Sequence, residues 1–533
     1  MEDKPMPVTT TMSERIEKRA QAIAALSNTT EWDIVVIGGG ATGLGAALDA
    51  AARGYRVLLL EQADFAKSTS SKSTKLVHGG VRYLAQGNVG LVREASIERG
   101  LLCRNAPHLV KNLGFVIPLY DFWDSIKYTI GLKLYDWISG RLSLGRSVHI
   151  SRKETLEQLP NIKTEGLLGG VRYHDGQFDD ARLAINLVQT LFEKGGFAIN
   201  YMKVTGLIKE GLHVRGVTAC DEETGMHYSL KAKAVINATG VFADDILQMD
   251  DPTAAKSICA SQGVHVVLDK TFHPSTSALM IPETADGRVL FVVPWHNKLI
   301  VGTTDTPVDA ASLEPVALEA EIGFILDTAG SYLIRKPARA DVLSVFAGLR
   351  PLAIPANGAQ KTKEISRSHK IMVSASKLFT ILGGKWTTYR RMGEDLVNRI
   401  EKELGWMPKQ SVTKTLLIHG YTTGINWDDP LYFYGADAVA LQQKMNDAGK
   451  WISEKLHIHE AQVAWAVQEE MARTVEDVLS RRTRALLLDA GESMRMARPV
   501  AELMAKQMQK DAQWVEDQVA TFSQLAASYK LRD

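Results

Sequence analysis

A short glycine-rich segment near the start of the chain has the residue types that can hold a dinucleotide phosphate. Its G-x-G-x-x-G pattern is formed by Gly38, Gly40 and Gly43. The apolar run before it, residues 33–37, is typical of a buried parallel strand, and a second such run ends just before Glu61. Glycines let a backbone approach a pyrophosphate at a helix N-terminus, and an acid at the end of the next strand can bind both ribose hydroxyls. The spacing predicts a dinucleotide-binding β-α-β unit.

Two later strand-like runs, residues 234–237 and 378–382, also end in small residues. Those small residues are Ala238, Gly240, Gly383 and Gly384. Only small residues let a backbone lie close to a flat or phosphorylated ligand. The chain has one G-x-G-x-x-G pattern in a strand–helix context, whereas a flavoenzyme that also binds a nicotinamide usually needs two. We therefore predict a single extended FAD that contacts all four residues, and no pyridine-nucleotide domain.

The remaining patterns predict an α/β protein with a helical end. Strand-like runs are expected at residues 198–204, 214–219, 234–237, 264–268, 289–294 and 298–302, and helices at 89–104, 181–193 and 313–329. From about residue 403 strand signals fade, and residues 458–476 and 511–529 have helical spacing. We predict a Rossmann-type FAD-binding domain over residues 31–400, interleaved with a mixed-sheet substrate domain (roughly 105–180 and 255–350), and then an α-helical C-terminal domain over 401–533.

Residues 1–30 are expected to form an N-terminal extension that is partly docked on the body. Within it, residues 13–26 could form a short amphipathic helix. The side expected to be apolar carries Ile16, Ala20, Ile23 and Ala24. The extension lacks the apolar centre of a signal peptide. It also contains acidic residues, which transit peptides largely lack.

The composition is that of an ordinary globular chain. Of 533 residues, 45% are hydrophobic and 23% charged, close to the globular average. Lys and Arg number 62 and Asp and Glu 61, so the net charge is only +1. The overall charge therefore does not indicate a nucleic-acid-binding protein. None of the three cysteines lies in a C-x-x-C pair, which argues against a zinc site or a disulfide framework and fits a reducing compartment. No apolar stretch approaches the ~18 residues of a membrane-spanning helix.

Several further motifs occur in a fixed order from about residue 30 onward. A Ser-rich stretch leads into Lys-Leu-Val-His-Gly-Gly-Val-Arg-Tyr-Leu at residues 75–84. The other segments are residues 179–183, 237–240, 263–267, 291–295, 302–305, 348–352, 366–367 and 383–390, and an Arg-Arg-Thr segment within 472–484. In this set the chain resembles the FAD-dependent glycerol-3-phosphate dehydrogenases, the respiratory relatives of D-amino-acid oxidase.

This resemblance implies oxidation of sn-glycerol 3-phosphate to dihydroxyacetone phosphate, with a hydride passing to FAD. His265 is the first candidate for the general base and His78 the second, since histidine titrates near neutrality. Arg350 could share the proton-handling role. The residues expected to bind the phosphate and hydroxyls are Arg82, Tyr83, Arg367 and Lys385. Arginine offers bidentate contacts to phosphate oxygens and lysine a compact charge.

The same resemblance extends the expected cofactor contacts into the Ser-rich segment and the last glycine turn. The additional residues are Ser70, Ser71, Lys75, His78, Gly79, Lys385 and Thr387. His78 could hold the flavin instead of accepting the proton. The histidine motif departs slightly from the family pattern, because Gln262-Gly263-Val264 precedes His265 where the family often has Lys or Arg and Ser.

A membrane quinone is the electron acceptor that the resemblance implies. The protein is then expected to be cytoplasmic and peripherally attached to the inner face of the cell membrane. Residues 122–138 are typical of an interfacial helix that could contact the membrane, but a buried core helix has the same pattern and is the favoured interpretation. A homodimer is left open.

The main alternative is a glycerol-3-phosphate oxidase that uses O2 and makes hydrogen peroxide. Such oxidases usually carry an extra inserted segment, for which the chain offers no obvious candidate. An amine or amino-acid oxidase of the same fold would need less positive charge than the Arg and Lys residues supply. A non-catalytic flavoprotein would not need His78, His265, Arg350 and Lys385.

Overall fold

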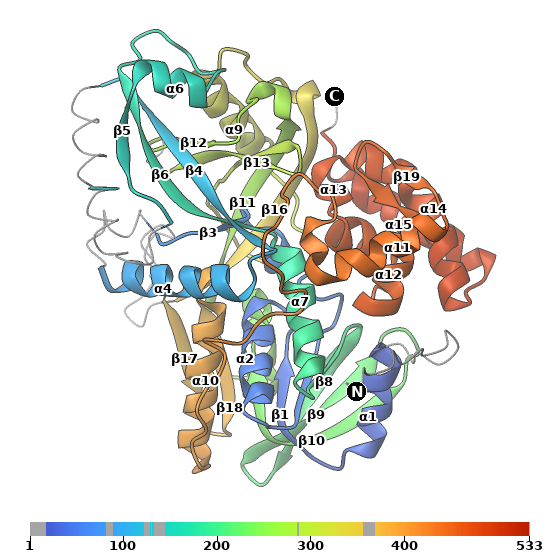
Figure 1. Cartoon of the computed structure of the whole chain (residues 1–533). Coiled ribbons are helices and arrows are strands. Elements are labelled where there is room, and N and C mark those ends of the chain that lie inside the picture. The colour runs from blue at the N-terminus through green and yellow to red at the C-terminus, as the bar shows by residue number, and fades with distance from the viewer. Residues whose placement is uncertain are drawn as a thin grey trace, which may run out of the picture.

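Two large sheets form the body of the molecule, and a helical C-terminal unit packs at one side of them (Figure 1). The computed structural model describes residues 18–80, 89–121, 128, 131–132, 144–284, 287–354 and 368–531. The first sheet is the lower one in Figure 1, and the second sheet lies above it. The predicted α/β fold with a helical C-terminal region is confirmed.

The first sheet has the order β17-β18-β10-β1-β2-β7, and β9 and β8 extend it from β10. Neighbours from β18 to β7 run parallel, whereas β17, β9 and β8 pair antiparallel. Its strands are β1 (Trp32–Ile37), β2 (Val57–Leu60), β7 (Phe197–Ile199), β8 (Met202–Glu210), β9 (His213–Asp221), β10 (His227–Asn237), β17 (His369–Val373) and β18 (Leu378–Gly383).

The predicted β-α-β unit is present as β1, α2 (Ala41–Ala52) and β2. The apolar strands are almost wholly buried because helices cover the sheet, and α2 itself packs against α7 (Asp180–Glu193) and α10 (Tyr389–Leu404). A side chain at Gly43 would place its Cβ 1.9 Å from the carbonyl oxygen of Gly38. Gly43 therefore lets α2 lie directly against the turn that follows β1.

The second sheet has the order β15-β11-β14-β13-β12-β4-β6-β3, with β16 paired to β11 and β5 to β6. Its strands are β3 (Leu76–Val77), β4 (Val110–Leu119), β5 (Val148–Ser151), β6 (Gly169–Phe178), β11 (Ile258–Asp269), β12 (Ala278–Ile281), β13 (Leu290–Trp295), β14 (Lys298–Gly302), β15 (Thr306–Val308) and β16 (Val342–Ala353). Apart from β3, these strands fall within residues 110–178 and 258–353.

Other helices cover the sheets and fill the turns between strands. The α-helices are α1 (Lys18–Asn28), α4 (Val89–Asn105), α6 (Arg152–Gln158), α8 (Ala243–Asp250) and α9 (Glu319–Tyr332). The short 3-10 turns are η1 (Thr69–Ser71), η3 (Gly240–Phe242), η4 (Lys270–Phe272), η5 (Arg339–Asp341) and η7 (Trp386–Thr388). None of the helices in the described ranges is long and apolar enough to cross a bilayer.

The C-terminal unit shares its apolar core with the second sheet. Its elements are η8 (Tyr432–Asp437), α11 (Ala438–Asp447), β19 (Trp451–Ser453), β20 (Ile458–His459), α12 (Glu460–Glu470), η9 (Asp477–Arg482), α13 (Ala485–Leu488), α14 (Ala490–Met508) and α15 (Ala512–Ala527). Residues of α12, η9, α13, α14 and α15 pack in one cluster with Val267, Trp295 and Phe346. The elements η8 and α11 pack instead in the core of the first sheet, through Phe433, Tyr434 and Leu441. The unit is therefore fixed to the body by continuous packing.

Three expected elements differ from the structure. The run at 198–204 is split into β7 and β8, because Tyr201 adopts a left-handed conformation (φ 55°) between them. The helix expected at 458–476 ends at Glu470, where the following Met471 is also left-handed (φ 57°). The helix expected from residue 313 begins at Glu319.

The N-terminal helix also buries a different face from the one expected. Helix α1 buries Arg19, Ala22 and Leu26, whereas Ala20 and Ala24 are exposed. Arg19 donates to the carboxylate of Asp221 over 2.7 Å, so an ion pair helps to set the rotation of the helix. Most of residues 122–138, the expected membrane or core helix, lies outside the described residues.

Candidate active site

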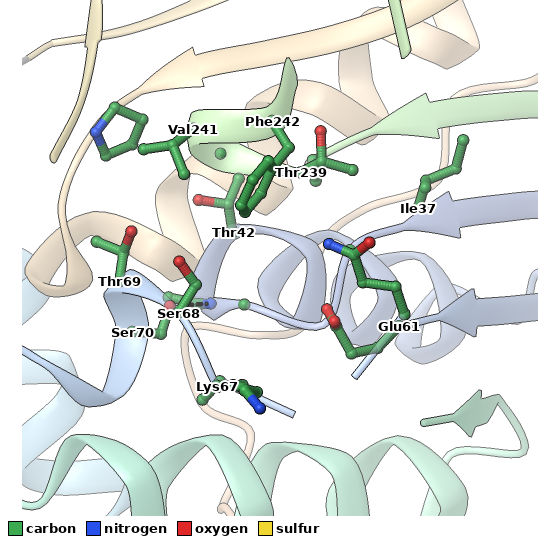
Figure 2. Close-up of a pocket in the computed structure, with 18 of the residues that line it drawn as sticks. Ile37, Thr42, Glu61, Lys67, Ser68, Thr69, Ser70, Thr239, Val241 and Phe242 are labelled. Carbon is green, nitrogen blue, oxygen red and sulfur yellow. Dashed lines mark hydrogen bonds between the residues drawn. The ribbon is translucent and has the colours of Figure 1, made fainter. Parts of the chain in front are cut away.

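A long cleft lies at the carboxyl ends of the parallel strands in the first sheet. Residues at the ends of β1, β2, β10 and β18 line it, together with the segment 66–70. Figure 2 shows Glu61 and Thr239 on the strand side of the cleft and Ser68, Thr69 and Ser70 on the opposite wall. Ligands of open α/β sheets bind outside the carboxyl ends of the strands.

The floor of this cleft is a backbone cradle built around Gly38 and Gly40. Gly38 has φ of 109°, and a Cβ there would lie 2.6 Å from the carbonyl oxygen of Ala238. At Gly40 a Cβ would lie 3.1 Å from the hydroxyl of Ser70 and would enter the cleft. Gly40 precedes α2 and makes no side-chain cap bond with it. The helix N-terminus and the bare backbone fit a pyrophosphate, as the spacing predicts.

Glu61 lies at the end of β2, where an acid for the ribose is expected. Its carboxylate accepts N–H bonds from Gly39 (2.6 Å) and Ala63 (2.9 Å). Burial raises the pKa of this carboxyl, while the two N–H groups oppose that rise. The two bonds hold the side chain in one orientation beside the glycine turn.

A second cavity meets the first at the turn between β18 and α10. Both are lined by Thr69, Pro351, Gly383, Gly384, Lys385 and Trp386. The second cavity is otherwise lined largely by strands of the second sheet and by the segment 72–78. Its polar lining includes His78, His265 and Arg350, from three separate segments. The fold thus brings the candidates for proton transfer and one phosphate candidate, Lys385, to one cavity.

His265 lies on β11 and is buried, with only 2% of its surface exposed. Its ring stacks on Phe346 with 4.9 Å between centroids, and Nε2 shares a 2.9 Å hydrogen bond with the Thr74 hydroxyl. Nδ1 has no hydrogen-bond partner among the described residues. Burial, and then the positive charge of Arg350, hold the pKa of His265 well below its usual value. The imidazole is therefore neutral near pH 7 and able to accept a proton.

Arg350 lies on β16 and is held by the loop that follows β14. Its guanidinium donates to the Thr303 hydroxyl (3.2 Å) and the Thr304 carbonyl (2.9 Å), and to Asp305 (3.3 Å). Asp305 also accepts a short hydrogen bond from the hydroxyl of Ser261. These contacts orient the guanidinium at the cavity wall. Sequence reasoning matched the segment 302–305 to a family motif but gave it no role.

Lys75 has a different setting from the other expected cofactor residues. Its ammonium donates to both carboxylate oxygens of Asp180 (2.7 and 2.8 Å) and to the Ser71 carbonyl (2.6 Å). Its side chain is fully buried and lines neither cavity. The ion pair of Lys75 with Asp180 thus links the Ser-rich segment to the N-terminus of α7.

The structure brings together most, but not all, of the expected site residues. Those that line one or both cavities are Gly38, Gly40, Glu61, Ser70, His78, Ala238, Gly240, His265, Arg350, Gly383, Gly384, Lys385 and Thr387. Those that line neither are Gly43, Ser71, Lys75 and Gly79. Arg82, Tyr83 and Arg367 lie outside the described residues.

Sequence similarity agrees with this geometry. Residues 33–389 match the family model described as FAD dependent oxidoreductase, and residues 380–515 match the C-terminal domain of alpha-glycerophosphate oxidase. The human mitochondrial glycerol-3-phosphate dehydrogenase is 38% identical over 545 residues, covering 94% of this chain and 74% of the relative. This chain belongs to the FAD-dependent glycerol-3-phosphate dehydrogenases. The family expected from the ordered motifs is thereby confirmed, as is FAD as the cofactor.

Other members of this dehydrogenase family extend the likeness. A probable mitochondrial enzyme from Dictyostelium discoideum is 40% identical and covers 86% of this chain and 78% of its own length. The solved glycerol-3-phosphate dehydrogenase from Bacillus halodurans, complexed with FAD, is 28% identical with a TM-score of 0.79, and the match covers 97% and 98% of the two chains. An L-alpha-glycerophosphate oxidase from Mycoplasma pneumoniae shares the fold, with 18% identity and a TM-score of 0.54 over 72% of this chain and 97% of that one.

Proposed function

We propose that this dehydrogenase oxidises the C2 hydroxyl of sn-glycerol 3-phosphate to give dihydroxyacetone phosphate and passes the electrons to a membrane quinone. The observation that carries the proposal is the junction of the two cavities at residues 383–386. A dinucleotide in the first cavity would there meet a substrate in the second. His265 and Arg350 line the second cavity beside that junction.

The residues of the first cavity would hold FAD along its length. The turn at Gly38 and Gly40 would carry the pyrophosphate, and Glu61 the adenosine ribose. The glycine turn at 383–384 lies where the flavin end would reach the second cavity. When bound, the flavin supplies the acceptor for a hydride from C2.

His265 would remove the hydroxyl proton as C2 gives up its hydride. A neutral imidazole is the form that can take a proton, and the lowered pKa keeps it neutral. Arg350 carries a fixed positive charge beside the same cavity, where it would stabilise the developing alkoxide. The hydride carries the two electrons and the imidazole receives the proton, so the step balances.

The substrate phosphate requires several cations. A phosphate monoester carries about −1.5 to −2 charges at pH 7, and removing it from water is costly unless donors replace that water. Lys385 lies at the cavity junction and is the described candidate, with Arg82 and Arg367 as the further candidates. Together with Arg350 these make four cations, of which two or three should reach the phosphate. At least one, Arg350 or Lys385, should face the C2 hydroxyl instead.

Lys385→Met should lower activity toward glycerol 3-phosphate more than activity toward glycerol, which has no phosphate. If Lys385 binds the phosphate, kcat/KM for glycerol 3-phosphate should fall by about 10- to 150-fold, the equivalent of ~1.5–3 kcal/mol for a hydrogen bond to a charged group. Plain glycerol should be a very poor substrate of the unmutated enzyme and should lose little more. Arg82→Ala and Arg367→Ala should behave alike. Steady-state rates with a dye acceptor would measure both substrates.

Lys377→Met is the matched control for this experiment. Lys377 precedes the same strand, β18, but its ammonium pairs with Glu403 (2.8 Å) away from both cavities. Its loss should leave both substrates unaffected. Equal losses on the two alcohols in Lys385→Met, or loss of its flavin, would remove Lys385 from the phosphate site. Efficient oxidation of glycerol by the unmutated enzyme would contradict the phosphate site as a whole.

A membrane quinone, rather than O2, is the acceptor that the family names favour. The relatives at 37–40% identity are named dehydrogenases, whereas the oxidase structure is 18% identical. A quinone dissolved in the bilayer is reached only from the membrane surface. The proposal therefore includes peripheral contact with the membrane, on the cytoplasmic side.

Glycerol 3-phosphate oxidation should depend on quinone supplied in lipid vesicles. We expect turnover with such vesicles to exceed turnover with dissolved O2 by about tenfold or more, with little hydrogen peroxide formed. Parallel assays of quinol and peroxide under air and under nitrogen would measure both routes. Vesicles without quinone are the control. Stoichiometric peroxide and no effect of quinone would make the enzyme an oxidase.

A further inference from the structure

The Arg-Arg-Thr segment of the C-terminal unit is buried against the loop after β2. We call residues 61–67 of this loop the cofactor loop, because Glu61, Gln62, Ala66 and Lys67 line the dinucleotide cleft. The side chains of Arg481 and Arg482 are at most 1% exposed, and so is that of Asp64 in the middle of the loop. Charged side chains are almost never buried this completely unless they are paired.

Asp64 is the point where the two arginines meet the cofactor loop. Arg481 donates to its carboxylate through Nε over 2.5 Å, and Arg482 through Nη2 over 3.0 Å with a second, shorter bond through Nη1. Burial raises the pKa of this carboxyl, but the two guanidiniums outweigh burial and lower it below the usual value. Asp64 is therefore an ionised partner for two arginines that lie 417 and 418 positions away in the sequence.

The C-terminal unit holds the other end of the loop as well. Glu476 accepts from Lys67 (2.8 Å) and from Arg481 Nη1 (2.9 Å), so one carboxylate joins the loop to the same arginine. Asp477 accepts from Arg481 Nη2 (2.8 Å) and from the hydroxyl of Tyr201 (2.7 Å). Every Arg481 nitrogen thus has an acidic partner. The π-helical turn η9, which carries both arginines, is a rare geometry that is frequent at functional sites.

The cofactor loop is in turn bonded to the glycine turn of the dinucleotide cleft. Ala66 donates its N–H to the carbonyl of Gly39 (3.1 Å), and Gly39 donates its own N–H to Glu61 (2.6 Å). In the sequence, Asp64 lies between Glu61 and Ala66, the two loop residues that make these contacts. Glu61 and Lys67, the first and last residues of this loop, are both drawn beside the cleft in Figure 2. A movement of Asp64 would therefore displace both the ribose acid and the support of the glycine turn.

We propose that Arg481 and Arg482 position the cofactor loop through Asp64, so that docking of the C-terminal unit completes the FAD site. The unit makes no direct contribution to the lining of the cleft among the described residues. Its direct side-chain contacts with the loop are made to Asp64 and Lys67, and Tyr201, which bonds Asp477, donates its own N–H to the Ala63 carbonyl. Asp64, Arg481 and Arg482 are accordingly positioning residues for FAD, and FAD binding and docking of the unit strengthen each other by the same factor. The proposal rests on FAD binding alone and is independent of the substrate and the acceptor.

The same interface contains a buried ion pair that does not touch the cofactor loop. Arg182 of α7 donates to the Glu470 carboxylate of α12 over 2.7 Å, and both side chains are fully buried. Glu470→Gln and Asp64→Asn each convert a buried, arginine-paired carboxylate into an amide of the same shape. Asp64 pairs with two arginines and Glu470 with one, so thermal unfolding must show how far each variant disturbs docking, but only Asp64 belongs to the cofactor loop.

Asp64→Asn should weaken FAD binding while Glu470→Gln should not. We expect the FAD dissociation constant to rise by about 10- to 100-fold in Asp64→Asn and by less than about threefold in Glu470→Gln, as for loss of a charged hydrogen-bond pair. Equilibrium dialysis of the full-length apoprotein with FAD measures the constants, and thermal unfolding of both apoproteins reports general stability. Equal losses of FAD affinity would assign Asp64 a purely structural role and overturn the proposal, as would unchanged affinity in Asp64→Asn.

Hydrogen exchange on the unmutated protein tests the coupling without a variant. FAD should slow exchange of amides in residues 61–67 and also in residues 477–482 of η9, which line no part of the cleft. Amides of α15 should change less than those of η9, because that helix packs mainly against α14. If FAD left the amides of η9 unchanged while protecting the loop, the C-terminal unit would not be coupled to the site.

Discussion

His265→Ala should leave FAD bound and slow reduction of the flavin by glycerol 3-phosphate by about 100-fold or more. The variant removes the only imidazole on β11, whose ring is fixed by Phe346 and Thr74 inside the second cavity. His265 lines the second cavity and not the dinucleotide cleft, so the cofactor should stay in place. Anaerobic stopped-flow measurement of flavin bleaching isolates the reductive step from the later transfer to the acceptor.

His273→Ala provides the matched control for the base. His273 is also buried and directly follows η4, the short turn after β11. Its Nε2 bonds the carbonyl of Ser277 over 2.8 Å, and it lines neither cavity. It should reduce stability without slowing flavin reduction. An unchanged reduction rate in His265→Ala would transfer the base to His78 or Arg350, and His78→Ala would then distinguish these two.

The dependence of flavin reduction on pH also tests whether His265 is the general base. Burial lowers the pKa of His265, and the charges of Arg350 and Lys75 lower it further below the usual 6.5. A base works only when it is unprotonated, so the rate should stay high as pH falls through 6.5 and decline only below that value. The acidic limb of the rate at saturating substrate should be absent from His265→Ala. A limb centred above pH 6.5 would conflict with the buried setting of His265.

The local parts of the fold were predictable because each depends on a few adjacent residues. Glycine spacing and short apolar runs located β1, α2 and β2 to within a few residues. The Ala198–Val204 run failed as a single strand because Asn200 and Tyr201 turn the chain there, where the Asn200 amide donates to Asp64 and to the Met471 carbonyl. A residue that breaks a strand to reach another domain leaves no periodic signal.

The site was only partly predictable for the same reason. Ordered motifs identified the residues around both cavities, but they could not separate a lysine that lines a cavity from one that pairs with Asp180, as Lys75 does. Neither could they show that Asp305 orients Arg350 or that Asp64 receives two arginines. Partners that are 45 to 418 positions apart are set by the packing of strands and helices, so only the folded chain reveals them.

Gly40→Val should give a folded protein that has lost its yellow colour. Gly40 faces the cleft at the start of α2, where the backbone itself must approach the pyrophosphate. A Cβ at this position would already lie 3.1 Å from the Ser70 hydroxyl, and that hydroxyl accepts the N–H of Ala41 over 3.0 Å. The two further methyl groups of valine would fill the space of the phosphate. The ratio of flavin to protein absorbance after purification with added FAD measures the loss.

Two control substitutions distinguish loss of the cofactor from misfolding. Gly40→Ala adds only the Cβ, so it should weaken FAD binding less than Gly40→Val and retain part of the colour. Gly323→Val places the same side chain on α9, where a Cβ meets no atom within 4 Å, and should keep the full flavin content. A Gly40→Val protein that binds FAD stoichiometrically with unchanged affinity would show that the phosphates do not pass over this turn. If it instead lost flavin together with its far-ultraviolet circular dichroism, the cradle at Gly40 would be a folding requirement and not a cofactor contact.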